Sequence, residues 1–168
     1  MSFLIILGVI IFCIFVIILL SNSESNKLDS FKNSNPELYQ KYKDAFDSHP
    51  GHFTGVQLTV EMVEQILLSG ETVNHSYSLP NFYDKTANLF VLTDKRLIYA
   101  GLKLTKREVK SIPYNKVENI DVLSKSLGTD LVVKSKEEKI EIFFNNFHKQ
   151  YFDKFYAFLT EKQLSQSS

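Results

Sequence analysis

The segment Leu92-Thr93-Asp94-Lys95-Arg96-Leu97-Ile98-Tyr99 indicates the fold, because it places a short polar turn between two apolar runs. Aspartate in such a turn can accept hydrogen bonds from backbone amides and so favours a tight connection between two strands. The run before the turn begins at Leu89 and is almost continuously apolar. Such a run is typical of a strand that is covered on both faces, or of one at a strongly curved position in a barrel. The segment therefore predicts an antiparallel pair of strands.

Alternating apolar and polar residues extend this β pattern in both directions along the chain. We expect strands at about residues 72–79, 86–93, 96–102, 106–112, 116–124, 129–135 and 139–144. After them, Phe147, Tyr151, Phe155 and Phe158 recur at helical spacing and predict an aromatic C-terminal helix. The predicted fold class is α+β and rich in β structure. Its seven short strands would form a bent sheet or partly open barrel that the C-terminal helix closes.

The N-terminus has a different character, because residues 3–20 are uninterruptedly apolar and the first charged side chain is Glu24. At about 1.5 Å per residue such a helix crosses most of a bilayer core, so the run predicts a transmembrane helix. A cleaved signal peptide is the alternative, with residues 21–23 (SNS) as the cleavage site. The length of the run and the absence of a preceding Lys or Arg favour a retained anchor. Lys27 and Lys32 favour a single-pass arrangement with the C-terminal domain in the cytoplasm.

The residues between this anchor and the β-rich body divide into two segments. Residues 21–35 are rich in Ser and Asn and predict a flexible linker. Residues 36–47 follow with an amphipathic pattern that predicts a short juxtamembrane helix. That helix could pack on the domain that follows, or it could lie on the lipid surface with Lys41 and Lys43 near the headgroups. The domain itself is expected at residues 57–162.

Three segments carry a resemblance to a known family. Residues 68–73 (LSGETV), 92–99 (LTDKRLIY) and 112–120 (IPYNKVENI) together resemble the bacterial pleckstrin-homology-like (PH-like) family. The resemblance covers roughly residues 60–162 and implies a seven-stranded bent barrel with a C-terminal helix, which agrees with the strand pattern. It implies no catalytic mechanism, and it supplies no single ligand, because these bacterial domains have no uniform one.

Two groups of residues are candidates for contact with a partner. The first is basic and has only Glu108 as local opposition; it contains Lys95, Lys103, Lys106, Arg107 and Lys110. These side chains could bind anionic lipid headgroups or an acidic protein, or they could simply be solvated and protect exposed strand edges.

The second group is Phe82 and Tyr83, in the predicted first loop at residues 79–85. PH domains that bind inositol phosphates use basic residues in and near this loop, whereas here it holds one Lys and one Asp. The aromatic pair could instead enter a membrane interface or a partner pocket.

Composition and spacing exclude several other functions. The 19 basic and 19 acidic side chains cancel, which argues against a nucleic-acid-binding protein. No catalytic constellation, cofactor motif or metal-ligand spacing is present, so we expect no catalytic residues, no cofactor and no metal. The sequence thus predicts a membrane-anchored, non-catalytic binding module with an unidentified protein or anionic lipid as partner. The alternatives are an exported soluble protein with a cleaved signal peptide, or an enzyme or toxin-neutralising factor on the same scaffold.

Overall fold

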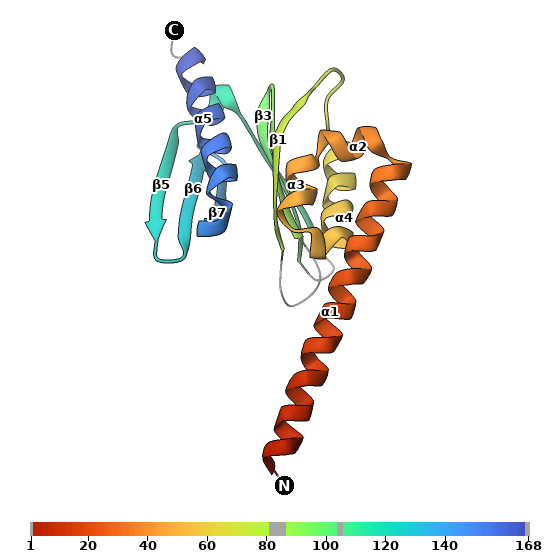
Figure 1. Ribbon diagram of the computed structural model, residues 1–168. Coiled ribbons are helices and arrows are strands. Elements are labelled where there is room, and N and C mark those ends of the chain that lie inside the picture. Colours follow the sequence, from red (N-terminus) through yellow and green to blue (C-terminus); the bar gives the residue numbers. More distant parts are fainter. Residues whose placement is uncertain (1, 81–86, 104–105, 167–168) are drawn as a thin grey trace.

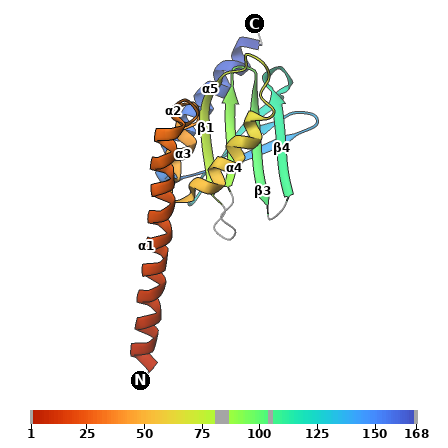
Figure 2. The same cartoon turned by 90° about the vertical axis from the view of Figure 1, so that its right-hand side faces the viewer.

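The protein has three layers, a group of helices and two β-sheets, and one long helix projects from them (Figures 1 and 2). The computed structural model describes residues 2–80, 87–103 and 106–166. The first four α-helices cover one face of the larger sheet, and the smaller sheet and the last helix lie against its other face (Figure 1).

The element order agrees with the strand pattern read from the sequence. The helices are α1 (Ser2–Ser34), α2 (Pro36–Lys41), α3 (Lys43–Ser48), α4 (Phe53–Glu64) and α5 (Lys149–Gln166), with short 3-10 turns η1 (Pro50–His52), η2 (Tyr114–Lys116) and η3 (Asn146–His148). The strands are β1 (Val73–Pro80), β2 (Ala87–Thr93), β3 (Arg96–Lys103), β4 (Lys106–Pro113), β5 (Asn119–Lys125), β6 (Gly128–Lys134) and β7 (Lys139–Asn145). The α+β class, the strands and the C-terminal helix are confirmed.

Within the described ranges the strands form two antiparallel sheets and no closed barrel. One sheet has the order β1-β2-β3-β4 and the other the order β5-β6-β7. In the predicted hairpin Leu92 faces Leu97 and Phe90 faces Tyr99, so the turn falls at Asp94-Lys95 as expected. The single bent sheet of the prediction is therefore split between β4 and β5, where η2 and the residues after it connect the two sheets.

Strands β2 and β3 are buried on both faces, which explains their continuous apolar sequence. Leu89, Val91 and Ile98 pack towards the helical layer. Phe90 and Leu97 belong to a second core that includes β6, β7 and α5. The aromatic C-terminal helix, which was predicted to close the sheet, packs in this second core, where Tyr151, Phe155 and Leu159 are buried.

Residues 21–34 differ from the flexible linker that we expected, because they continue α1 as a helix. Leu28 and Phe31 lie one helical turn apart and are buried, with the Phe31 ring 5.3 Å from the rings of both Phe46 and Phe53. Polar composition suggested a spacer that buries little, but these two side chains pack the segment against the helical layer. In the part of the chain that the structure describes, no helix is long and apolar enough to cross a membrane.

The predicted helix at residues 36–47 is present as two short helices, α2 and α3, that meet at Tyr42. Tyr42, Ala45 and Phe46 are buried in the core shared with β2 and β3, which favours packing on the domain over a position on the lipid surface. Helix α4 contributes Val56, Val60 and Val63 to that core. The packed unit thus begins well before the boundary at residue 57 that the sequence suggested.

Candidate functional site

The five basic candidates lie at three different places. Lys95 is in the turn between β2 and β3, at the opposite end of β3 from Lys103. Lys106 and Arg107 are exposed at the start of β4, beside the end of β3. Lys110 pairs with Tyr99 in the middle of β4 and lines a cleft. Only Lys103, Lys106 and Arg107 are close in the sheet, so the structure does not unite all five in one patch.

The aromatic loop candidates, Phe82 and Tyr83, lie outside the residues that the structure describes. Their contact with a membrane or partner stays a prediction.

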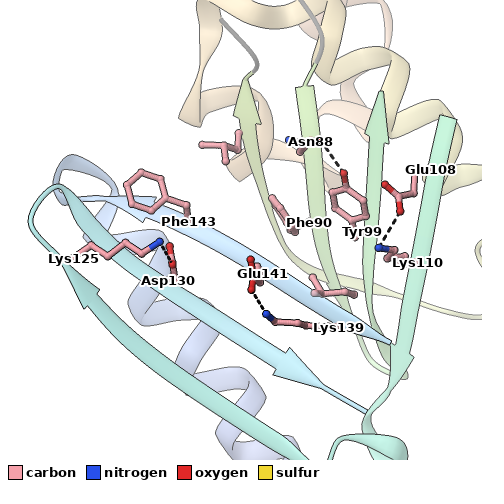
Figure 3. A pocket seen from close by; sticks show the side chains of 12 residues that line it. Asn88, Phe90, Tyr99, Glu108, Lys110, Lys125, Asp130, Lys139, Glu141 and Phe143 are labelled. Carbon is pink, nitrogen blue, oxygen red and sulfur yellow. Dashed lines mark hydrogen bonds and ion pairs between the residues drawn. The ribbon is translucent and has the colours of Figure 1, made fainter. Parts of the chain in front are cut away.

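A cleft of about 610 Å³ lies between the two sheets. One wall comes from the inner face of β1–β4 and the other from the β7 side of the smaller sheet (Figure 3). The lining side chains combine an apolar floor with charged groups: Leu79, Asn88, Phe90, Tyr99, Glu108, Lys110, Lys125, Asp130, Lys139, Ile140, Glu141 and Phe143. The cleft exists because the sheets separate here, away from the core that α5 fills.

Three ion pairs line this cleft. Lys110 Nζ lies 2.9 Å from Glu108 Oε1, both on β4. Across the cleft Lys139 pairs with Glu141, and Lys125 pairs with Asp130 (Figure 3). Each lysine therefore has a carboxylate partner within the lining, and the described charges of the cleft cancel. This balance differs from the excess of positive charge that a phosphate-rich ligand would require.

Tyr99 forms the aromatic centre of the wall on the larger sheet. Its hydroxyl donates a 3.1 Å hydrogen bond to Asn88 Oδ1 on the neighbouring strand. The tyrosine side chain lies across Gly101, where a Cβ atom would be only 2.1 Å from the Tyr99 hydroxyl oxygen. Gly101 is therefore needed for this close approach. Tyr99 is also 5.3 Å from Phe90, ring centre to ring centre, which gives the wall a continuous aromatic surface.

The protonation states of the cleft favour fixed charges rather than proton transfer. Burial, followed by the charge of Glu108, raises the pKa of Tyr99, so its phenol stays neutral. The hydrogen bond that Lys110 donates to Glu108 raises the pKa of Lys110, and the one that Glu141 accepts from Lys139 lowers the pKa of Glu141. Among the described lining residues there is neither histidine nor cysteine. The arrangement can recognise a ligand by shape, aromatic contact and paired charges.

The residues of the predicted hairpin segment have a structural role beside this cleft. Glu71 is buried and accepts 3.0 Å hydrogen bonds from Arg96 Nε and Nη2, one on each carboxylate oxygen. Thr93 Oγ1 donates a 2.7 Å bond to Glu71, and Arg96 Nη2 also donates to the carbonyl of Ile66. The Tyr114 hydroxyl donates to the carbonyl oxygens of Thr93 and Arg96. One network thus joins the three segments quoted above for the family resemblance.

The turn itself is stabilised differently from the sequence expectation. The amides of Lys95 and Arg96 donate to Thr93 Oγ1, whereas Asp94 Oδ1 accepts a 2.8 Å bond from the amide of Thr72. Asp94 therefore ties the hairpin to the start of β1 instead of closing the turn locally. Arg96 behaves as expected, since its guanidinium reaches both a carboxylate and a carbonyl oxygen.

Sequence reasoning missed most of the cleft. Lys110 was a candidate because of the charge run, and not because of its position opposite the second sheet. Alternate charges at Glu108 and Lys110, and again at Lys139 and Glu141, were the available signal. Each pair is spaced by two residues and so lies on one face of a strand. That pattern does not reveal that the two faces meet.

Comparisons with known proteins place the chain in a family. The model of the bacterial PH domain family matches residues 62–161. Among solved structures, a DUF1696-family protein with a pleckstrin-homology domain from Shewanella loihica is 14% identical with a TM-score of 0.49, and the match covers 64% of this chain and 92% of that one. A pleckstrin homology domain from Shewanella amazonensis is 19% identical with a TM-score of 0.45, covering 64% and 96%. The comparison with curated proteins gave no match. The family match extends over more than half of the chain, which therefore belongs to the bacterial PH domain family.

Proposed function

We propose that this protein is a non-catalytic binding module that residues 3–20 hold beside a membrane, with the cleft between its two sheets as the site for a partner. The observation that carries this proposal is the continuity of α1, which passes without a break from an apolar end into the packed domain. The described apolar side chains of that end are 43–66% exposed; they are Ile6, Leu7, Val9, Ile10, Ile11 and Phe12. Exposed surface of this kind needs a lipid or protein environment.

The joint between α1 and the domain supports the proposal, because it is polar, specific and well satisfied. Glu24 Oε2 accepts a 2.8 Å bond from the amide of Thr54 in the first turn of α4, and Glu24 Oε1 lies 2.7 Å from Lys27 Nζ. Burial acts to raise the pKa of Glu24, but the hydrogen bonds from Lys27 and Thr54 outweigh it and lower the pKa. The carboxylate therefore stays ionised and caps α4.

Lys103, Lys106 and Arg107 are proposed to meet anionic headgroups. The ends of β3 and β4 that carry them point in the direction in which the N-terminal half of α1 projects (Figure 2). A domain held at a membrane by α1 would therefore present these residues to the lipid surface. Lys95, at the far end of β3, would not take part.

The test of membrane attachment uses the full chain expressed in bacteria. We expect it in the membrane fraction and resistant to extraction with alkaline carbonate. Replacing both Val9 and Ile10 with lysine should release it, since each charge at the centre of a spanning helix costs about 2.5–3.5 kcal/mol. The control is Leu58→Lys with Leu123→Lys, at side chains of the domain that are 40% and 51% exposed.

Two results would contradict the proposal. Release of the unmodified chain by carbonate would refute insertion of residues 3–20. A mass of the purified chain that lacks the apolar run would show instead that a signal peptide had been cleaved.

The basic residues are tested in the variant released from the membrane, in which Val9 and Ile10 are both replaced by lysine. Its residual binding to anionic vesicles should fall with added salt, and it should fall further when Lys106 and Arg107 are replaced by glutamine. Equal binding with and without these two residues would exclude a headgroup contact there.

A further inference from the structure

Two apolar side chains of the domain are more exposed than any other large apolar side chain that the structure describes. Phe147 is 93% exposed in η3, and Leu127 is 75% exposed in the turn between β5 and β6. Single exposed apolar residues are common, but a phenylalanine almost wholly in water is not, because its large ring gains nothing from folding in that position. These two side chains are therefore candidates for contact with something outside the domain.

The two residues belong to one rigid tip. The Asn146 amide donates a 3.2 Å bond to the Leu127 carbonyl, and Asn146 Nδ2 donates a 3.4 Å bond to the Ser126 carbonyl. Asn145 Oδ1 accepts from the amide of Phe147 and so fixes the start of the turn. Hydrogen bonds thus hold the two connecting segments side by side, and their apolar side chains are held on short, ordered turns rather than on a long loop.

This tip lies at the end of the domain from which α1 projects. The turn between β5 and β6 and the beginning of α5 lie low on the smaller sheet in Figure 1, on the same side as the N-terminal half of α1. The segments that carry the exposed apolar tip and the exposed apolar part of α1 therefore lie on the same side of the domain in this view.

The charges around the tip suit a lipid surface. Lys125 precedes the β5–β6 turn and Lys149 follows η3, with side chains that are 57% and 78% exposed. Each also has a carboxylate partner, Asp130 for Lys125 and Asp153 for Lys149, so the lysines bring charged groups to the tip without an excess of positive charge. An apolar pair flanked by lysines can place the rings and methyl groups at the acyl boundary while the ammonium groups remain among the headgroups. A bilayer is favoured over a protein surface, because the tip and the apolar half of α1 lie on the same side of the domain (Figure 1).

We propose that Leu127 and Phe147 enter the headgroup–acyl boundary of the bilayer that holds residues 3–20, as a second membrane contact. This inference rests on the proposed function. It adds a contact made by the smaller sheet, remote in sequence from the basic residues of β3 and β4. Two contacts on opposite sides of the domain, with α1 as the third, would fix its tilt against the membrane.

The experiment uses the absence of tryptophan from the chain. Phe147→Trp introduces a single reporter into the full protein, which is reconstituted in phosphatidylcholine vesicles with and without brominated acyl chains. We expect emission at shorter wavelength than in detergent-free buffer, and strong quenching by the brominated lipid. The matched control is Leu68→Trp, at a side chain that is 54% exposed in the connection between α4 and β1. That position lies at the other end of the larger sheet and should not be quenched.

Each outcome bears on a different claim. A chain that floats with the vesicles but shows no quenching at position 147 refutes the second contact and leaves membrane attachment intact. A chain that does not float refutes both. Equal quenching at positions 147 and 68 shows that the domain has no fixed orientation, which also overturns the inference. Emission at position 147 that shifts only with rising protein concentration would assign the tip to contact between copies of the chain.

Discussion

Replacing Glu71 by glutamine tests whether the buried ion pair with Arg96 stabilises the fold. The Glu71 side chain is completely buried, that of Arg96 is 15% exposed, and their shortest contact is 3.0 Å. Each carboxylate oxygen accepts two hydrogen bonds: Oε1 from Thr93 and Arg96, and Oε2 from Arg96 and the amide of Leu68. Glutamine keeps the shape, but its amide nitrogen would point a donor at two other donors and leave the guanidinium without a counter-charge.

The size of the effect follows from this geometry. Removing one partner of a buried ion pair costs about 3–5 kcal/mol, because the other charge stays buried and uncompensated. For a chain of this length about 1 kcal/mol lowers Tm by roughly 2–4 °C, so the expected fall is on the order of 6–20 °C. The control is Glu141→Gln, which breaks the pair with Lys139, whose side chains are 57% and 52% exposed. Such an exposed pair is worth less than about 1 kcal/mol.

The assay is thermal unfolding of the full chain in detergent, followed by near-ultraviolet circular dichroism. The chain has 8 Tyr and 14 Phe residues. The near-ultraviolet signal reports those that are packed in the two cores, and it does not depend on the helicity of α1. A second variant, Glu71→Leu with Arg96→Met, removes both charges and should be more stable than Glu71→Gln alone. A fall in Tm no larger than that of Glu141→Gln would refute the reasoning, as would a double variant less stable than the single one.

Three further predictions follow from the cores and the cleft. Deleting residues 2–56 should abolish cooperative near-ultraviolet unfolding, because the helical layer covers β2 and β3; a sharp transition in the truncated chain would contradict this. Gly101→Ala should displace the Tyr99 side chain and cost about 1 kcal/mol through its lost hydrogen bond. The loss should not add to that of Tyr99→Phe in thermal unfolding, and additive losses would show that the two residues act separately. Burial, then the charges of His148 and His52, lower the pKa of His49 to about 4 from the usual 6.5. The unfolded chain therefore binds the proton first, and stability should fall as the pH drops from about 6.5 towards 4. A His49→Phe variant should lose that part of the pH dependence of Tm, and an unchanged slope would assign it to other groups.

The strands could be predicted from the sequence because their pattern is local. Alternation set the edges of all seven to within a few residues, and the continuous run at residues 89–92 correctly indicated a strand covered on both faces. The helical layer was harder to predict. Leu28 and Phe31 were visible as a pair one turn apart, but Ser and Asn around them suggested a linker. The sequence does not show which residues two apolar side chains in a polar segment will contact. In this structure the Phe31 ring packs against Phe46 and Phe53.

The cleft could not be predicted for a related reason. Its walls come from strands separated by up to about sixty residues, and the distance between two sheets is set by the core that α5 fills. The basic candidates were chosen by nearness in sequence, and successive residues on a strand point to opposite faces. Arg107 therefore lies on the face opposite to Glu108 and Lys110, which line the cleft. Lys106 shares the face of Lys110 but lies at the start of β4, where it is exposed and outside the cleft lining. Charged residues that follow one another on a strand should therefore be assigned to its two faces before they are grouped into one surface patch.

The continuity of α1 through residues 21–34 changes how the domain would meet other molecules. A disordered Ser/Asn-rich tether of that length would have a mean reach of roughly 20 Å and would let the domain tumble. The helix has nearly the same reach, at about 1.5 Å per residue, but without the scatter. If residues 3–20 attach the protein to a membrane as proposed, a domain on such a helix would keep its cleft at one height above the bilayer. It would retain mainly rotation about the helix axis and diffusion in the membrane plane. The cleft would then bind mainly partners that lie at that height, so the length of the helix would set the distance from the membrane at which binding occurs.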